Sequence, residues 1–264
     1  MICDPANPKG TGPVSVWLET FPVRFGAIDR SDRLTQTAVF QFFQEAAISH
    51  AENLGAGRED LAESGRAWIL SRMSVLVKRR PRYRETITVR SWPRGSEKLF
   101  AIRDYDILDE DGVSAVFARG AWLVVDMEKR RPLRPQSVVE KLPANEGMET
   151  FPSEAKDAPP IESLAVRSDL QKSGGRKALY ADIDYNGHVN NARYIQWIED
   201  LISPGELEKA DETRFDINYL SEILAGESVD IFSAPIGGVA FAFEGRKAET
   251  GQAAFRAELR LVSQ

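Results

Sequence analysis

The pattern of apolar and polar positions predicts two similar series of elements along the chain. The first opens with a strand over residues 14–25, rich in β-branched and aromatic side chains, and Pro22 should place it at a sheet edge or a bulge. A loop over 26–34 leads into a helix over 37–53, whose apolar residues form one stripe that ends at Gly55. Four further strands are expected, over residues 68–79, 85–92, 98–108 and 114–126.

The periodicity fades between residues 132 and 175, where prolines accumulate at positions 132, 135, 143, 152, 159 and 160. We expect a long connection between two domains there. The series then starts again, with one or two strands over 164–183, a helix over 191–203 and strands over 213–220, 227–234, 237–247 and 252–262. The predicted organisation is a flexible tail (1–12), a first repeat (13–132), a proline-rich connection (133–163) and a second repeat (164–264).

Residue comparison supports the duplication of one module. The segment Asp29–Leu34 resembles Asp184–Val189, which lies 155 residues further on. The apolar helix positions follow in the same register: Phe40 with Ile195, Phe42 with Trp197, and Phe43 with Ile198. Each half is too small to bury a long helix against a sheet alone, so we expect one continuous sheet around two helices.

Three polar side chains stand close together in the second copy of this segment, namely Asp184, Asn186 and His188. Asn190 or Asn191 is a suitable N-cap for the following helix, so the three groups lie at the positive end of a helix dipole. A polarised carbonyl or a developing oxyanion would be stabilised there. His188 alone could equally be a capping or packing residue, so its role depends on its neighbours.

The second half resembles the acyl-acyl-carrier-protein (acyl-ACP) thioesterases, whose signature Asp-x-Asp-x-Asn-x-His-Val-Asn-Asn is followed by Tyr-Ile-x-Trp. The matching residues are Asp182, Asp184, Asn186, His188, Val189, Asn190, Asn191, Tyr194, Ile195 and Trp197. The first half is similar to the same family at residues 23–25, 28–30, 44–47, 71–73, 121–126 and 130–131.

This resemblance, to a bacterial relative of the plant fatty acyl-ACP thioesterases, covers nearly everything except the tail and the connection. It implies an α+β double hotdog fold, in which each repeat wraps an antiparallel sheet around a long central helix. It also implies a thioester hydrolase that releases free fatty acid from acyl-ACP and so terminates fatty-acid synthesis.

The resemblance further implies a carboxylate from a later segment, because residues 218–222 match the family and place it at Glu222. Many members have a cysteine directly after this position, whereas this chain has Ile223 there and Cys3 as its only cysteine. A thiol nucleophile is therefore excluded.

Two mechanisms remain open at this stage. Glu222 could act as general base on a water that His188 and Asn186 position, or Asp184 could attack the thioester directly and form a mixed anhydride. In the first case Asp184 would hold the loop and tune His188, and Asp182 would support the loop. The backbone amides of residues 189–191 are candidate oxyanion donors.

The first repeat lacks these side chains. His188 is answered by Arg33, Asn186 by Ser31 and Glu222 approximately by Arg80. We therefore predict one active site per chain, in the second half, with the first half mainly forming the acyl-chain pocket. The predicted pocket and substrate contacts are Phe40, Phe42, Phe43, Trp68, Met73, Val189 and Asn190. His50, the other histidine, is expected to be structural.

Composition narrows the class of protein. The chain has 264 residues, of which 42% are hydrophobic and 28% charged, and a net charge of −6 that argues against nucleic acid as a partner. No apolar run approaches a membrane span, and the N-terminus lacks the features of a signal peptide, so a cytoplasmic protein is expected. A single cysteine can build neither a disulfide framework nor a metal cage, so no metal or cofactor is expected.

Basic residues are concentrated in one segment: Lys78, Arg79, Arg80, Arg82, Arg84, Arg90 and Arg94. They could protect a solvated strand edge, or they could dock an acidic partner such as acyl carrier protein. Alternatives to the main prediction are an acyl-coenzyme A thioesterase of the same fold, a non-catalytic acyl-binding protein, and a hydratase of related fold that would need paired histidines. Chain-length and saturation preference are not predicted, and a homodimer is possible.

Overall fold

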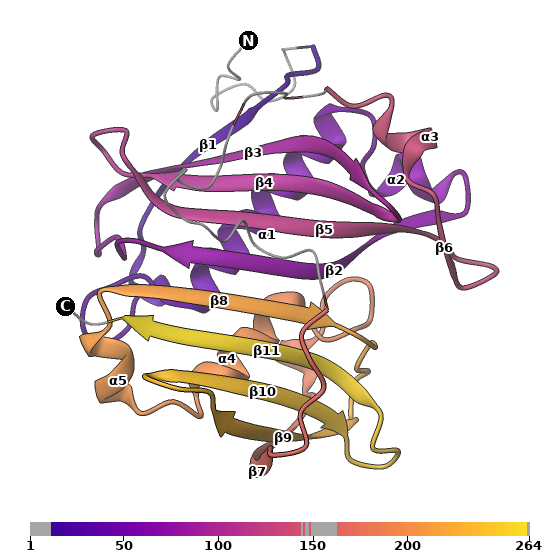
Figure 1. Ribbon diagram of the computed structural model, residues 1–264. Helices are drawn as coiled ribbons and strands as arrows, with labels where there is room; N and C mark the ends of the chain where they lie inside the picture. Colours follow the sequence, from indigo (N-terminus) through magenta and orange to yellow (C-terminus); the bar gives the residue numbers. More distant parts are fainter. Residues whose placement is uncertain (1–11, 144, 146–147, 149–162, 263–264) are drawn as a thin grey trace.

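The structure is a computed structural model that describes residues 12–143, 145, 148 and 163–262 (Figure 1). Cys3, all but the last residue of the predicted tail, and the middle of the predicted connection lie outside the described residues. Within this part of the chain, no helix is both long and apolar enough to cross a membrane.

The first half contains the predicted elements with small shifts at their ends. Helix α1 (Gln36–Asn53) begins where Thr35 Oγ1 accepts a hydrogen bond from Ala38 N at 3.1 Å, and it ends before Gly55, which has a φ of 65°. The strands are β1 (Trp17–Pro22), β2 (Arg66–Val77), β3 (Thr86–Glu97), β4 (Phe100–Leu108) and β5 (Ser114–Asp126). Four short elements were not predicted: the 3-10 helix η1 (Phe25–Ala27), α2 (Arg58–Ala62), β6 (Arg131–Leu133) and α3 (Gln136–Val139).

The strand expected to stop at residue 92 continues to Glu97 as part of β3. The pairing of β3 with β4 shifts by one residue between Pro93 and Gly95. Because proline cannot donate to the ladder, the bulge absorbs it and lets the strand resume. Pro22 shows the other solution: it ends β1, which is the edge strand of the sheet, as predicted.

The second half repeats the series, with a shorter helix than expected. Helix α4 (Asn191–Glu199) ends four residues before the predicted position, because Pro204 starts a separate helix, α5 (Pro204–Lys209). Proline has no amide hydrogen and disfavours a helical residue before it, so it suits the first turn of a new helix and not the interior of a long one. The strands are β7 (Gln171–Lys177), β8 (Glu212–Tyr219), β9 (Ser228–Pro235), β10 (Ala240–Lys247) and β11 (Ala253–Val262).

The strands form one antiparallel sheet whose order is symmetric about its centre. The order is β1-β3-β4-β5-β2-β8-β11-β10-β9-β7, and β6 pairs separately with β5. The two halves join where β2 pairs with β8, and Ser74 there lies opposite Asp216. These two residues are 142 positions apart, and the same offset relates Arg80 to Glu222, so Ser74 and Asp216 are equivalent positions of the two repeats. Because equivalent residues lie opposite each other here, the pseudo-two-fold axis of the duplication passes between them. The predicted continuous sheet is confirmed.

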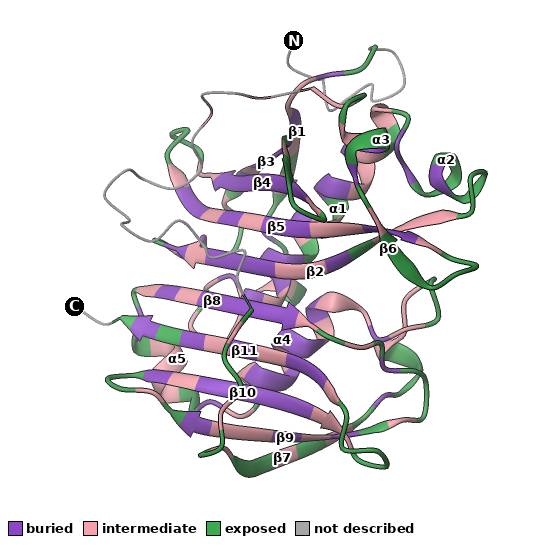
Figure 2. Cartoon of the chain, turned by 45° about the vertical axis from the view of Figure 1, so that its right-hand side comes forward, coloured by how far each residue is buried: buried purple, intermediate pink, exposed green. Residues whose placement is uncertain are grey.

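Both long helices lie on the same face of this sheet, which curves around them (Figures 1 and 2). Their apolar faces belong to one core cluster that spans both halves. Phe40 of α1 packs edge-on against Phe215 of β8, at 5.7 Å between ring centroids, so the first helix also contacts the second half. Each large apolar side chain buried in this way stabilises the fold by about 2 kcal/mol, and removing either half would expose the core of the other.

Candidate active site

The second-half loop, residues 183–190, is fixed by its own backbone. Asp184 N donates to His188 O at 2.9 Å, and Gly187 N donates to Asp184 O at 3.0 Å. The Asp184 carboxylate accepts from Asn186 N at 2.8 Å, which is an Asx-type turn. Gly187 has a φ of 82°, a conformation that disfavours most side chains. These bonds therefore fix the backbone from which Asp184, Asn186 and His188 project.

Glu222 arrives at this loop from the segment between β8 and β9. Val189 N donates to Ile223 O at 2.9 Å, and His188 forms an isolated bridge with Leu224, so the two segments are held together directly after Glu222. His188 Nε2 lies 3.1 Å from Glu222 Oε2, with side-chain exposures of 39% and 47%. An imidazole and a carboxylate that are paired and open to water form a proton-handling unit, which can take a proton from a water molecule and return it to a leaving group.

The helix start behind the loop is held by hydrogen bonds and aromatic packing. Asn190 caps α4 by accepting from Ala192 N at 2.9 Å, and Tyr219 Oη donates to Asn191 O at 3.1 Å. Burial raises the pKa of Tyr219, and burial together with the negative charge of Asp184 raises that of Tyr194. Both phenols therefore stay neutral and can serve as hydrogen-bond donors beneath the loop.

One of the three predicted oxyanion donors is left available. The amide of Val189 bonds to Ile223 O, and the amide of Asn190 bonds to Asp182 O at 2.8 Å. Among the described residues, no acceptor is found for the amide of Asn191. Periodicity could not have separated these three amides, because their partners come from the tertiary structure.

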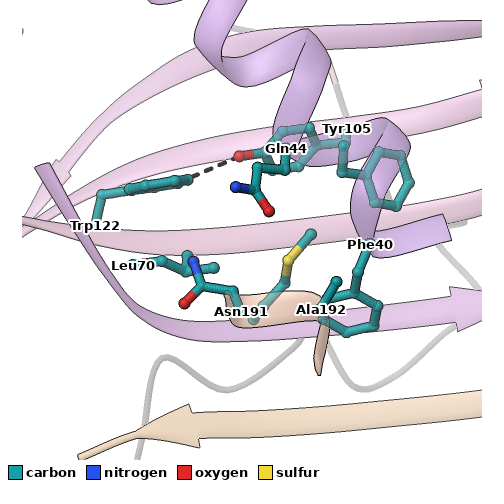
Figure 3. A pocket seen from close by; sticks show the side chains of 9 residues that line it. Phe40, Gln44, Leu70, Tyr105, Trp122, Asn191 and Ala192 are labelled. Carbon is teal, nitrogen blue, oxygen red and sulfur yellow. Dashed lines mark hydrogen bonds between the residues drawn. The ribbon is translucent and has the colours of Figure 1, made fainter. Parts of the chain in front are cut away.

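A small cavity lies beside the start of α4, between the two halves. The cavity has room for about one water molecule, and Trp122 Nε1 donates to Tyr105 Oη at 3.2 Å on its wall (Figure 3). The lining residues are Phe40, Phe43, Gln44, Leu70, Met73, Tyr105, Trp122, Asn191 and Ala192. The first half supplies seven of these nine residues, and its role as the acyl-chain pocket stays a prediction.

The predicted pocket residues fall into two groups. Phe40, Phe43 and Met73 line the cavity. Trp68 does not, because its Nε1 donates to Ala56 O at 2.9 Å and its ring packs in a separate, smaller cluster.

The other predicted contacts also lie outside the lining. Phe42 packs against Phe21 at 5.0 Å between ring centroids, Val189 is buried in the core, and Asn190 is occupied as the helix cap. The alternation along β2, β4 and β5 carries the unpredicted lining residues Leu70, Tyr105 and Trp122. A two-residue periodicity assigns such residues to a face but does not say which of them border a hollow.

The corresponding loop of the first half, residues 28–35, repeats the backbone with different side chains. Asp29 N donates to Arg33 O at 2.9 Å, Asp32 N to Asp29 O at 3.1 Å, and Ser31 N to the Asp29 carboxylate at 2.8 Å. Leu34 N donates to Pro81 O at 2.8 Å, as Val189 N does to Ile223 O. Arg80 therefore occupies the place of Glu222.

Arg80 turns this first-half position into a structural ion pair. Its Nη1 lies 2.6 Å from Asp29 Oδ2, with side-chain exposures of 6% and 23%, and its Nη2 donates to Leu207 O. Burial raises the pKa of Asp29, but the bond from Ser31 and the charge of Arg80 outweigh burial and lower it. Asp29 is thus a paired carboxylate with no proton to exchange near neutral pH.

Most of the basic segment between residues 78 and 94 is neutralised by carboxylates. The ion pairs are Lys78–Glu212 (2.8 Å), Arg79–Glu85 (2.9 Å), Arg79–Asp109 (3.2 Å), Arg80–Asp29, Arg90–Asp106 and Arg94–Asp104. Arg82 and Arg84 are exposed and have no carboxylate partner among the described residues, and Arg84 lies over the ring of Tyr83. Across all of the residues that the structure describes, no group of three or more His, Cys, Asp or Glu side chains could hold a metal ion.

Two antiparallel half-sheets, each curved around one central helix and joined edge to edge, define the double hotdog fold. The two copies of the loop carry different side chains. The model of the acyl-ACP thioesterase N-terminal domain matches residues 15–142, and that of the acyl-ACP thioesterase C-terminal domain matches residues 169–263. The chain belongs to the acyl-ACP thioesterase family.

Individual relatives agree with this assignment. The chain is 25% identical to an acyl-ACP thioesterase from Bacteroides thetaiotaomicron, whose crystal structure gives a TM-score of 0.83 over 94% of this chain and 98% of that chain. The 12:0-ACP thioesterase from Umbellularia californica has the same fold, with a TM-score of 0.80 and 20% identity over 95% and 98% of the two chains. A chloroplastic acyl-[acyl-carrier-protein] hydrolase from Cuphea viscosissima is 26% identical over 234 residues, 82% of this chain and 55% of the relative. The chain thus spans about half the length of the curated relatives that it matches.

Proposed function

We propose that this protein hydrolyses the thioester of fatty acyl-ACP and releases the free fatty acid, which ends fatty-acid synthesis. The observation that carries the proposal is the contact between His188 Nε2 and Glu222 Oε2, 3.1 Å apart, at the start of α4. A small cavity with mainly apolar lining borders Asn191 and Ala192 from the same helix start, and it would widen to receive the acyl group. Family membership supplies the carrier as the expected leaving group.

The proposed chemistry starts with a water molecule. Glu222, with His188 beside it, removes a proton from this water while the water oxygen attacks the thioester carbonyl carbon. The carbonyl π electrons move to oxygen, and the tetrahedral intermediate collapses by breaking the carbon–sulfur bond. The sulfur takes up the proton, so the products are a fatty acid and the carrier thiol.

Asp184 is the rival nucleophile, through a mixed anhydride. Its carboxylate already accepts from Asn186 N within the loop, which favours an orienting role, since this bond would have to weaken before attack. A single turnover in ¹⁸O-labelled water tests the anhydride route. Label in Asp184, or an unlabelled first product, would establish an anhydride that water opens at the aspartyl carbonyl. General-base catalysis places the label only in the fatty acid, a result that an anhydride opened at the acyl carbonyl would share.

The test of function is thiol release from acyl carrier protein loaded with chains of graded length, beside the same chains on coenzyme A. We expect release from the carrier protein and its loss in Glu222→Ala and His188→Ala. No release from any chain, or undiminished release in both variants, would refute the proposal. Faster release from coenzyme A would establish the acyl-coenzyme A thioesterase instead.

Docking of the acidic carrier is proposed at the basic patch formed by Lys78, Arg79, Arg80, Arg82 and Arg84. Since the other three are paired with carboxylates, Arg82 and Arg84 should carry most of the attraction. Charge reversal at both positions should raise KM for acyl-ACP several-fold at low salt and leave coenzyme A substrates unaffected. Equal KM values for the variant and the native protein would remove the patch from the docking site. A cytoplasmic location and a possible homodimer stay predictions from the sequence.

A further inference from the structure

The duplication relates the start of α1 to the start of α4. A carboxylate side chain is bound at the start of α1, and none is bound at the start of α4 among the described residues. An offset of 155 residues pairs Gln36 with Asn191 at the start of the helices. The same offset pairs Gln44 of α1 with Glu199 of α4. Glu199 hydrogen-bonds to the start of α1, and Gln44 borders the same cavity as the start of α4, so each of these residues faces the start of the other helix. The groups that Glu199 contacts at the start of α1 therefore indicate what kind of ligand the start of α4 could bind near Gln44.

Glu199 binds the start of α1 with both carboxylate oxygens. Oε1 accepts from Gln36 N at 2.9 Å, and Oε2 accepts from Thr37 N at 3.3 Å and from Thr37 Oγ1 at 2.5 Å. The first-half helix start is thus a carboxylate-binding site that the chain fills with its own side chain. Oxygen atoms with negative charge are the natural ligand of such a position.

The start of α4 has the same construction but is open. Gln44 has the length of Glu199 without its charge, and no hydrogen bond joins it to Asn191 or Ala192 in the described part of the chain. The cavity lies between them instead, and Gln44, Asn191 and Ala192 all border it (Figure 3). Asn191, the equivalent of Gln36, carries the amide for which no acceptor is found, whereas Ala192 N is already bound to Asn190.

We infer that Gln44, a residue of the first half, contacts the substrate and completes the oxyanion site of the other half. Its side-chain amide and the Asn191 N–H would donate to the thioester carbonyl oxygen, at the place that corresponds to Glu199 Oε1 in the first half. Two donors aimed at this oxygen stabilise the charge that develops as the π electrons move onto it. A glutamate at position 44 would occupy the Asn191 amide itself and repel the oxyanion. This inference rests on the proposed hydrolysis.

The test uses the full-length chain and three variants: Gln44→Ala, Gln44→Glu and, as a matched control, Gln41→Ala. Gln41 lies on the same helix but on its exposed side. We expect Gln44→Ala to lower kcat for acyl-ACP about 100-fold with little change in KM, which is the usual effect of losing one oxyanion donor. Gln41→Ala should keep both constants.

Gln44→Glu separates a substrate contact from a packing role. The introduced carboxylate should bind the helix start as Glu199 does, so the melting temperature should stay the same or rise while kcat falls at least as far as in Gln44→Ala. The activity of this variant should recover partly at acid pH, where the carboxyl group is protonated and can donate, and the native enzyme should not show this recovery. Native kcat in both Gln44 variants, or a loss that follows their melting temperatures, would overturn the inference.

Product binding gives a readout that does not depend on turnover. The carboxylate of dodecanoate should bind at the same two donors, so calorimetric titration should show weaker binding to Gln44→Ala and none to Gln44→Glu. If the native protein hydrolyses no thioester, the proposed function fails, and these titrations still decide whether Gln44 and Asn191 form the oxygen-binding site. Equal dodecanoate affinity in all four proteins would reject that site even if the enzyme is active.

Discussion

The two loops of this molecule, residues 28–35 and 183–190, share a backbone and differ in chemistry. The three internal hydrogen bonds of one loop recur in the other at nearly the same distances, and each loop is clamped to the segment that follows its central strand. The two loops differ in their side chains. Arg80, which is buried and paired with Asp29, stands at the position that Glu222, which is exposed and paired with His188, occupies in the other half. The loop geometry is therefore a property of the fold, and the reactive groups are an addition to it.

The comparison also shows that the polar positions of the first half are part of the framework of the fold. In the first half, positions that could bind substrate are filled from within: Arg80 neutralises Asp29, and Glu199 occupies the start of α1. In the second half the same positions are open to water or to the cavity. Substitutions at equivalent positions should thus affect activity in one half and stability in the other.

The largest expected effect is on activity. His188→Ala and Glu222→Ala should each lower kcat about 1,000-fold, and the double variant should be no worse than either single variant, since residues that act as a unit are not additive. Arg33→Ala, the equivalent change in the first half, should stay within about two-fold of the native kcat, since residues outside the reacting groups make no contact with the transition state. Steady-state thiol release measures all four. Independent losses that multiply in the double variant would show that the two residues do not share one proton transfer.

The next largest effect is on stability, and here a substitution in the first half should matter more than one in the second half. Arg80→Ala leaves the Asp29 carboxylate without its cation and should lower the free energy of unfolding by about 3 kcal/mol. Glu222→Ala removes an exposed group and should change it by no more than about 0.5 kcal/mol. Urea unfolding measured at pH 7 compares them directly. Similar losses in the two variants would contradict the division into a structural and a reactive copy.

A third prediction concerns pH and the histidine that takes no part in the proposed chemistry. His50 Nε2 donates to Val14 O at 2.9 Å, its Nδ1 accepts from Arg103 at 3.0 Å, and its ring stacks on Trp17. Burial, reinforced by the charge of Arg103, lowers the pKa of His50 to about 3. Hydrogen bonding to the backbone of Val14 and Ser91 acts on the pKa of His50 in the opposite direction but is outweighed.

Because the folded pKa of His50 lies below its unfolded value, the stability it contributes is complete above about pH 6.5 and is lost as the pH falls toward 3. The loss should reach about 2 kcal/mol at pH 5, at 1.4 kcal/mol per pH unit. Burial raises the pKa of Glu199, which acts in the opposite direction, so the measurement is the difference between native and His50→Gln unfolding free energies. That difference should shrink from pH 7 to pH 5, and a constant difference would show that His50 is charged in the folded state.

The sequence predicted the fold and the polar loop because both depend on local signals. Apolar stripes located α1 and α4, alternation located the long strands, and the repeat at 155 residues indicated one shared sheet. The ends of α4 and β3 were missed because a proline begins a new helix in one case and is absorbed by a bulge in the other. Neither choice is encoded by periodicity.

The candidate site was predicted less completely. The residues of the loop follow each other in sequence, but Gln44 and Trp122 come to the cavity from another helix and another strand. The same limit applies to the basic segment, whose carboxylate partners, such as Glu212 and Asp109, lie far along the chain. Family resemblance placed Glu222 beside the loop, whereas no feature of the sequence assigned a partner to Arg80.

The smallest predicted effect tests whether the shared loop backbone is set by the fold. Gly187 and its first-half equivalent Asp32 both adopt positive φ, 82° and 63°. A Cβ added at Gly187 would meet no atom within 4 Å, so the cost of a side chain there is conformational only.

Gly187→Ala should lower the unfolding free energy by about 1 kcal/mol, and Gly187→Asn by about half as much, because a short polar side chain tolerates the left-handed region. Asp32→Gly should change it by less than about 0.5 kcal/mol, since relief of strain is offset by the freedom of glycine in the unfolded chain. Urea unfolding of the three variants gives the comparison. Equal losses for Gly187→Ala and Gly187→Asn would mean that the loop has moved to another conformation, and that its likeness to residues 28–35 is not imposed by the fold.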